Sequence, residues 1–403
     1  MRSLLVLLGL FLCSNALSVL PTTTVASAPS ANATTDRDCA CTHSKIWLDI
    51  AIVVDISEAM GSGLYEVAAD LATVFGQLTV SQQAGQFSRV ALVSAGGKAT
   101  QISDLTTYQN TEALLNDLMS LQPSQDKFVN IQAALQTASN IFASAKTERN
   151  RKQVVLLYAS AYNQGGFQDP METAIQMRDS GISIVTVAYV QATETNDVLK
   201  IGELASPSFN YSNVKNGDLV NRIMDTFCQV NCFCRTNWAQ FSDSYNTPGA
   251  RVYGVCVQYV GIQASWFAAN AIGCRNKGNG GYLVTEYSDK KHKFNRAYYT
   301  DAHNKTSTTK VVNYHIGLRT NVAHQNGYVW VQGNNKYVPF DSNSFHAWGP
   351  GYPSGMHGDC VSAKQSAFQV TWQNVNCFSE SQNYLCEATS CDTDNYCDSV
   401  DEF

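Results

Sequence analysis

Four unbroken apolar runs of strand length, separated by helical patterns, constrain how the first half of this chain can fold. The runs cover residues 46–54, 89–94, 154–158 and 182–190, and the helical patterns cover residues 64–78, 111–121, 131–145 and 170–179. Because the apolar residues in each run do not alternate with polar ones, the strands should be buried on both faces. Strands that alternate with helices in this way predict a parallel sheet flanked by helices, an α/β doubly wound fold.

The N-terminus has the pattern of a secretory signal peptide. Arg2 is followed by an apolar run at 4–12 and by small residues that end at Ala16. We therefore expect residues 1–16 to be removed and the protein to be secreted into the extracellular space. Residues 17–38 are rich in Thr, Ser, Ala and Pro without an apolar period, which predicts a flexible stalk. No later apolar run reaches the length of about 18 residues that a membrane span requires.

Cysteine usage agrees with an oxidising compartment. The chain has thirteen cysteines, and twelve remain once Cys13 leaves with the signal peptide. An even number favours six disulfides. The pairs Cys39-x-Cys41 and Cys232-x-Cys234 would also suit a zinc site on spacing alone, but disulfides are the better interpretation in a secreted chain.

The composition changes after Cys228 and divides the chain. We assign residues 39–232 to a first domain and residues 233–388 to a second one, which is α+β with short strands, because Asn, Gly and aromatic residues become more frequent there. Residues 389–403 form an acidic segment, which we expect to be a solvated tail with a local cysteine pair.

Surface features narrow the range of partners. The net charge of −6 argues against nucleic acid and anionic membranes, which both require a basic surface. Sequons predict glycosylation of a glycoprotein surface at Asn32, Asn210 and Asn304.

The segments "DIAIVVDISEAM", "FSRVALVSAGG" and "VVLLYAS" resemble the von Willebrand factor A domain. The resemblance implies a divalent-ion site formed by an Asp-x-Ser-x-Ser loop, a threonine and a second aspartate. Asp55 and Ser57 match this pattern, whereas Ala59, Val129 and Ala159 stand where the other oxygen ligands belong. Two of five ligands are too few for a hard cation. We therefore expect no bound metal, and we expect Asp55 to cap the following helix.

The segments "CRTNW", "YGVCVQY", "ASWFAANAIGCRNKGNGGYLV", "NYHIGLR" and "WQNVNCF" resemble the C-type lectin-like domain. In that family a calcium ion held by two oxygen-rich tripeptides and an acid binds the sugar. In this chain the first tripeptide contains Tyr352 and Ser354, the acid is replaced by Gly358, and the second tripeptide contains Gln373 and Asn374. Since no carboxylate remains, we expect very weak calcium binding. Tyr352, in a long loop, is the candidate for a ligand contact.

The two resemblances also imply a disulfide scheme. The four cysteines at the two ends of the A-type domain should pair with each other, Cys39 and Cys41 with Cys228 and Cys232, and the partner of each stays open. The implied pairs in the remainder of the chain are Cys274–Cys386, Cys360–Cys377, Cys234–Cys256 and Cys391–Cys397.

These observations favour a recognition protein over an enzyme. The sequence has no nucleophile elbow, P-loop, zinc-protease helix or dinucleotide fingerprint, so we expect neither catalysis nor a cofactor. The domain combination resembles secreted invertebrate proteins of host defence or extracellular recognition. The leading hypothesis is a protein that binds an extracellular protein, or a glycan without calcium. The alternatives are a calcium-dependent carbohydrate-binding lectin with an unusual site and a structural extracellular component. The sequence identifies neither the ligand nor the oligomeric state.

Overall fold

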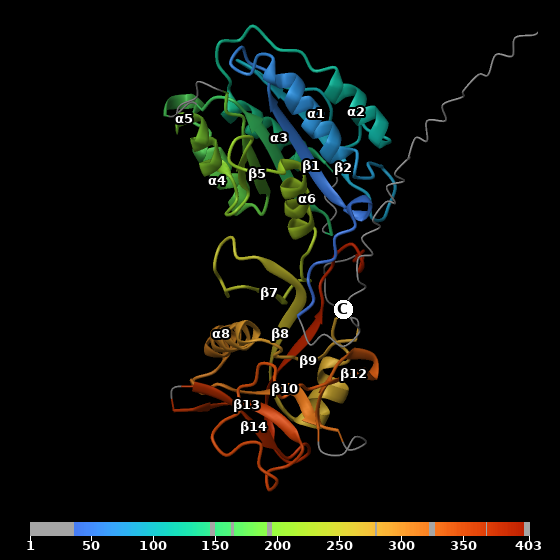
Figure 1. Cartoon of the computed structure of the whole chain (residues 1–403), viewed down its shortest axis with the longest axis vertical. Coiled ribbons are helices and arrows are strands. Elements are labelled where there is room, and N and C mark those ends of the chain that lie inside the picture. Colours follow the sequence, from blue (N-terminus) through green and yellow to red (C-terminus); the bar gives the residue numbers. More distant parts are fainter. Residues whose placement is uncertain are drawn as a thin grey trace, which may run out of the picture. The chain divides into compact units, whose positions relative to one another are not determined.

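The computed structural model of the chain describes residues 36–145, 150–162, 165–191, 196–278, 280–321, 327–367 and 369–398. The predicted signal peptide (1–16), most of the predicted stalk (17–35), the sequon at Asn32 and residues 399–403 lie outside the described residues. Figure 1 follows the chain from the first strands to the last ones by colour. Within the described ranges, each helix is too short or too polar to cross a membrane.

The first half is built on a six-stranded sheet with the strand order β3-β2-β1-β4-β5-β6. The edge strand β3 is antiparallel to β2, and all other neighbours are parallel. The strands are β1 (Leu48–Asp55), β2 (Arg89–Ala95), β3 (Ala99–Gln101), β4 (Lys152–Ala159), β5 (Ser183–Ala188) and β6 (Asn210–Ser212). The helices are α1 (Gly63–Phe75), α2 (Thr111–Met119), α3 (Ile131–Ser144), α4 (Met171–Asp179), α5 (Asn196–Leu199) and α6 (Leu219–Val230).

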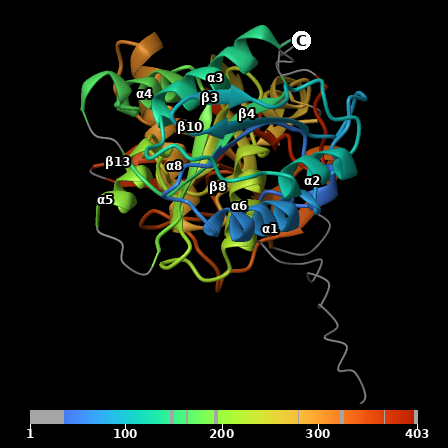
Figure 2. The same cartoon turned by 90° about the horizontal axis from the view of Figure 1, so that it is seen from above.

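Helices cover both faces of this sheet. Apolar side chains of α1, α2 and α6 pack on one face, and those of α3 and α4 pack on the other; Figure 2 shows α1 and α3 on opposite sides of β4. Every residue of β1 and β2 is buried as a result, which is why their apolar runs show no alternation. The predicted fold is confirmed. Its boundaries shift by a few residues, and the three-residue strands β3 and β6 are too short to give a sequence pattern.

The second half contains a nine-stranded sheet whose main path is β12-β11-β10-β15-β8-β7, with β13, β14 and β9 attached. Trp330 and Trp372 lie in its core, and Trp348 packs against them while partly exposed. The strands are β7 (Ala239–Ser242), β8 (Val252–Ser265), β9 (Tyr282–Leu283), β10 (Asn313–Thr320), β11 (Tyr328–Val331), β12 (Tyr337–Pro339), β13 (Cys360–Ser366), β14 (Gln369–Val375) and β15 (Ser381–Thr389). The helices are α7 (Trp266–Ala268), which continues as a π-helix over Ala269–Cys274, and α8 (Asp289–Thr306).

Six disulfides join the described cysteines. Four of them are the pairs implied for the remainder of the chain: Cys274–Cys386, Cys360–Cys377, Cys234–Cys256 and Cys391–Cys397. For the four cysteines whose partners the sequence leaves open, the structure pairs Cys39 with Cys232 and Cys41 with Cys228. These two bonds close loops of 193 and 187 residues, for which the chain-entropy account gives about 4–5 kcal/mol of stabilisation each.

The acidic segment after residue 389 is packed against the protein, so the prediction of a solvated tail is wrong for its described part. Asp392 has no exposed surface, and its carboxylate forms an ion pair with the Arg37 guanidinium, with Nη2 and Oδ1 2.9 Å apart. The ring of Tyr396 packs edge-on against Trp47, with ring centroids 5.2 Å apart. Arg37 and Asp392 are 355 residues apart in sequence, so local composition cannot indicate their contact.

The residues before the first domain are bound to the second half. The amide of Gly254 donates to the carbonyl of Arg37 at 2.8 Å. The buried ammonium of Lys291 lies 3.5 Å from the carboxylate of Asp36 and 3.3 Å from that of Glu387. Residues 36–38 are therefore anchored, unlike the flexible stalk that the sequence predicts there.

Candidate functional site

The carboxyl end of β1 places Asp55 in a closed set of hydrogen bonds. Asp55 is the last residue of β1 and has no exposed surface. Its Oδ1 accepts the amide of Ser57 at 2.8 Å, and its Oδ2 accepts both the amide and the hydroxyl of Ser160, at 2.9 and 2.7 Å. Asp55 thus ties the loop after β1 to the end of β4. It does not cap α1, which begins at Gly63, so the expected capping role is corrected.

The remaining positions of this end do not fit a hard divalent cation. Val129 and Ala159 are fully buried in an apolar cluster and offer no side-chain oxygen, and Ala59 is exposed on the loop. The hydroxyl of Ser57 is buried without a hydrogen-bond partner. Six to eight oxygens would be needed for calcium, or near-octahedral geometry for magnesium. Asp55, which already accepts three hydrogen bonds, and one unpaired hydroxyl do not supply them.

In the part of the chain that the structure describes, one group of three candidate metal-ligating side chains comes together. It consists of Cys41, His43 and Cys228. The two sulfurs form a disulfide with each other, so they are not thiolate ligands. The zinc alternative for Cys39-x-Cys41 and Cys232-x-Cys234 is likewise replaced by disulfides, since all four cysteines are bridged.

In the second half, the side chain of Asn374 on β14 holds the long loop that precedes β13. Its Nδ2 donates to the carbonyl oxygens of Ser354 and Gly358, both at 2.7 Å, and its Oδ1 accepts the amide of Ser354 at 2.8 Å. Asn374 is almost fully buried. Because an amide offers donors and an acceptor while a carboxylate only accepts, Asn374 can bind two loop carbonyls that would otherwise need a cation.

The backbone around Gly358 explains the missing acid in this loop. Gly358 has a φ of +109°, and a Cβ there would lie 2.7 Å from the carbonyl oxygen of Val375. A glutamate at this position would therefore force the loop away from the end of β14. With neutral Gln373 partly exposed beside it, the loop contains no carboxylate at the family's calcium positions, and these residues do not fit calcium.

Tyr352 lies in the same loop and is partly buried. Its ring packs edge-on against His357, with ring centroids 5.4 Å apart, and its amide donates to the carbonyl of Gly349. The loop is thus an ordered surface with an aromatic side chain at its edge.

Sequence reasoning missed Ser160, and it named Asn374 without its role in holding the loop. Ser160 directly follows Ala159, the position where the resemblance implies an oxygen ligand. A hydroxyl one residue after that position was the sequence signal that could have identified Ser160. The role of Asn374 depends on both ends of one amide reaching the loop, which residue identity alone does not indicate.

Residues 49–226 match the family model described as von Willebrand factor type A domain. These residues of the first half form a von Willebrand factor A-type domain. Asp55, Ser57 and Ser160 therefore lie at the edge of the A domain where the resemblance places its divalent ion.

A curated relative covers both halves. Over 377 residues the chain is 32% identical to C-type lectin domain-containing protein 160 of Caenorhabditis elegans, a match that covers 90% of this chain and 56% of that protein. The chain thus spans about half the length of this relative. Together with the disulfides and the sheet described above, this similarity supports the C-type lectin-like fold of the second half.

Solved structures with similar parts include proximal thread matrix protein 1 from the mussel byssus, which is 20% identical with a TM-score of 0.38 over 48% of this chain and 46% of that one. Another is the C-type lectin domain of murine dendritic cell inhibitory receptor 2 in complex with an N-glycan, 20% identical with a TM-score of 0.27 over 39% of this chain and 98% of that domain.

The lectin-like domain also contains a buried ion pair behind β14. Nδ1 of His292 lies 2.7 Å from the carboxylate of Glu286, and its Nε2 lies 3.1 Å from the carbonyl of Val370. Because both partners are acceptors, both ring nitrogens must donate, which requires a protonated imidazole. Burial alone would lower the pKa of His292, but the Glu286 carboxylate outweighs burial and raises the pKa. Glu286 also accepts the indole N–H of Trp372 at 2.6 Å.

His315 shows the opposite behaviour in the same domain. It is fully buried on β10, and burial lowers its pKa to about 4. Its Nδ1 lies 2.8 Å from the hydroxyl of Ser362, and its Nε2 lies 3.0 Å from the carbonyl of Ala264. A neutral ring satisfies both contacts, with Nε2 donating and Nδ1 accepting. His315 is therefore a neutral residue of the domain core.

Two of the predicted glycosylation sites are described. Asn210 is exposed on β6, and Asn304 is exposed on α8. Their occupancy stays a prediction.

Proposed function

We propose that this chain is a secreted, non-catalytic recognition protein that binds an extracellular protein, or a glycan without calcium. The observation that carries the proposal is the Asn374 clamp, in which one amide makes the three loop contacts. Since the clamp orders the loop with protein atoms alone, its surface is available for recognition without an ion. A role in host defence belongs to the same proposal and rests on the domain combination.

Secretion is supported by the signal-peptide pattern and by the disulfides. All twelve cysteines outside the predicted signal peptide are bridged. Such usage is typical of an oxidising compartment and rare in the cytosol.

Two surfaces are available for a partner. On the lectin-like domain, Tyr352 offers an aromatic face at the edge of the ordered loop. On the A domain, Phe128 and Phe167 are exposed in the segments that precede α3 and α4, near the carboxyl edge of the sheet. Exposed aromatic side chains are frequent anchors of protein interfaces, so we assign glycan recognition to the first surface and protein recognition to the second.

A glycan array probed with and without EDTA tests the proposal. The wild-type protein is compared with Tyr352→Ala and with Tyr337→Ala, a matched control in which an exposed tyrosine is removed from β12. We expect glycan signals that EDTA leaves unchanged and that only Tyr352→Ala removes. Signals abolished by EDTA would instead support a calcium-dependent lectin. The absence of any glycan signal would favour a protein partner or a structural role.

A further inference from the structure

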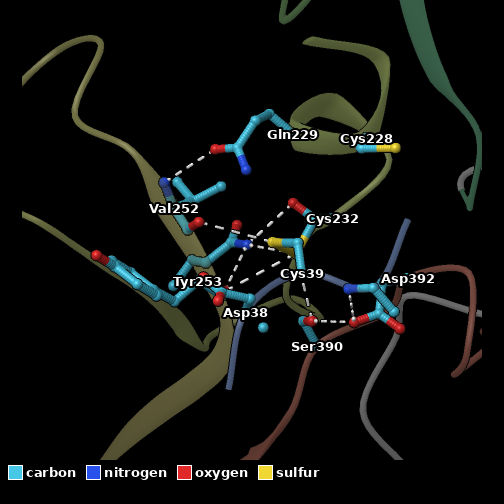
Figure 3. The surroundings of a disulfide bond; sticks show 12 residues. Asp38, Cys39, Cys228, Gln229, Cys232, Val252, Tyr253, Ser390 and Asp392 are labelled. Atoms are coloured by element: carbon cyan, nitrogen blue, oxygen red, sulfur yellow. Dashed lines mark hydrogen bonds between the residues drawn. A yellow bond between two sulfur atoms is a disulfide. The ribbon is translucent and has the colours of Figure 1, made fainter. Parts of the chain in front are cut away.

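A cleft of about 490 Å³ lies beside the amino ends of β4 and β5. One wall comes from the A domain, through Phe209, Tyr211 and Val230, and the other from the segment 249–252 that enters β8. The walls are joined by hydrogen bonds: the amide of Val252 donates to Oε1 of Gln229 at 3.1 Å (Figure 3), and the hydroxyl of Ser208 donates to the carbonyl of Gly249, also at 3.1 Å. Clefts of this size are typical of sites for small molecules.

One cation in the lining has no anionic partner. Lys152, the first residue of β4, lines the cleft and is partly buried. Its Nζ lies 4.8 Å from the ring centroid of Phe233. Among the described residues no carboxylate lies within ion-pair distance of it, and burial lowers the pKa of Lys152. The π face attracts the ammonium but does not neutralise it, so an anion in the cleft would be favoured.

The rest of the lining limits what that anion can be attached to. Phe209, Val230 and Val252 offer apolar surface, while the hydroxyls of Ser183 and Ser206 offer a few hydrogen bonds. The two exposed charged residues, Asp225 and Arg251, have opposite signs, and Arg251 lies 3.8 Å from Asp38. A ligand that fits has one negative group for Lys152 and an apolar body for the walls.

We propose that this cleft binds a small organic acid with an apolar body, whose carboxylate pairs with Lys152. The site is separate from the lectin-like loop and from the carboxyl edge of the A domain. Its ligand is therefore additional to the partner considered under the proposed function.

The test uses the intact chain and 11-(dansylamino)undecanoic acid, with the methyl ester of the same compound as the uncharged control. We expect the acid to bind at least about tenfold more tightly than the ester in a fluorescence titration, because a hydrogen bond to a charged group is lost with the ester. Lys152→Gln should lower the affinity for the acid to that for the ester. Lys152→Arg should keep the preference, as should Lys98→Gln, which changes an exposed lysine elsewhere.

Several results would overturn the proposal. These are no binding of the acid by the wild-type chain, equal binding of acid and ester, or an unchanged preference in Lys152→Gln. Thermal melts establish that each variant is folded. If Lys152→Gln does not fold, Lys152→Arg still tests the proposal. Because arginine keeps the positive charge, loss of the preference for the acid in a folded Lys152→Arg variant would contradict a site that depends on charge.

Discussion

The carboxyl edge of the A domain and the long loop of the lectin-like domain lie where the two resemblances place a metal, and their polar groups are arranged differently. The A domain keeps one acidic ligand, Asp55, whose carboxylate accepts hydrogen bonds from Ser57 and Ser160. The lectin-like domain has no carboxylate at those positions and uses the amide of Asn374 to bind two loop carbonyls and one loop amide. At the edge of the A domain, protein donors bind the carboxylate of Asp55. In the lectin-like loop, the amide of Asn374 donates to carbonyl oxygens that an ion would otherwise bind.

The difference lies in how completely each region satisfies its polar groups. The hydroxyl of Ser57 remains buried without a partner, whereas both ends of the Asn374 amide are used. The acid of the A domain needs donors around it, and the hydroxyl of Ser57 beside it is left unpaired. A single amide that both donates and accepts avoids that cost.

The largest effect is expected from Asp55→Ala. The substitution leaves the amides of Ser57 and Ser160 buried without their acceptor, so we expect a loss of about 3–5 kcal/mol in the free energy of unfolding of the A domain. Chemical denaturation measures it. Asp179→Ala, at an exposed position at the end of α4, is the control and should stay within about 0.5 kcal/mol of wild type. Equal stabilities of the two variants would mean that Asp55 does not hold this edge together.

A somewhat smaller loss is expected from Asn374→Asp, which introduces a carboxylate at the second tripeptide. The carboxylate would face the carbonyl oxygens of Ser354 and Gly358 without a proton to donate, so the lectin-like domain should lose about 2–4 kcal/mol. Gln373→Glu introduces the same charge at the neighbouring, partly exposed position and should change stability little. If calcium restored the stability of Asn374→Asp to that of wild type, the Asn374 side chain would take the place of a calcium ion. A single substitution would then be enough to create the calcium site.

These two regions mark what the sequence reveals and what it does not. The parallel sheet follows from unbroken apolar runs, and the missing oxygens at Val129 and Ala159 follow from the resemblance to the A domain. The hydrogen-bond partners of Asp55 cannot be predicted in this way. The contact of Ser160 with Asp55 joins residues 105 positions apart, and it depends on two strand ends meeting in space. The burial of Asp392 against Arg37 was missed for the same reason, since an acidic segment appears solvated until its distant cation is known.

A pH dependence should distinguish the lectin-like domain through His292, which packs against β14, the strand of Asn374. Because the pKa of His292 is raised in the fold, its contribution is fully present below the unfolded value of about 6.5 and is lost as pH rises through the folded pKa. We therefore expect His292→Gln to cost about 1–3 kcal/mol at pH near 6 and less under alkaline conditions.

The measurement is chemical denaturation at both pH values, with His346→Gln as the control at an exposed position. The groups that face His292 include Glu286, whose own pKa is held below its ordinary value because His292 and its other hydrogen-bond donors outweigh burial; the others are Asp289, Val370 and Phe345. A cost that stays constant with pH would show that His292 acts by packing alone.

Ser57→Ala should produce a gain in place of a loss. The hydroxyl is buried and unpaired, so its removal should leave the A domain unchanged or about 1 kcal/mol more stable. Ser88→Ala is the matched control, because the hydroxyl of Ser88 is equally buried but donates to Ile46 and accepts from Leu48; it should cost about 1–3 kcal/mol. Similar losses in both variants would mean that Ser57 has a partner in solution, for which a bound cation is one candidate.

The smallest effect is expected from the ions themselves. A ligand at one hundred times its dissociation constant would stabilise the fold by about 2.7 kcal/mol, which corresponds to several degrees of melting temperature for domains of this size. Because the A-domain site has too few oxygen ligands and the lectin-like loop contains no carboxylate at the family's calcium positions, millimolar magnesium or calcium should shift the melting temperature by less than about one degree. A shift with magnesium that Asp55→Ala abolishes would place an ion at the A domain, and a shift with calcium that Asn374→Ala abolishes would place one in the loop. A shift that survives both substitutions would point to a different site and leave the comparison between the two regions intact.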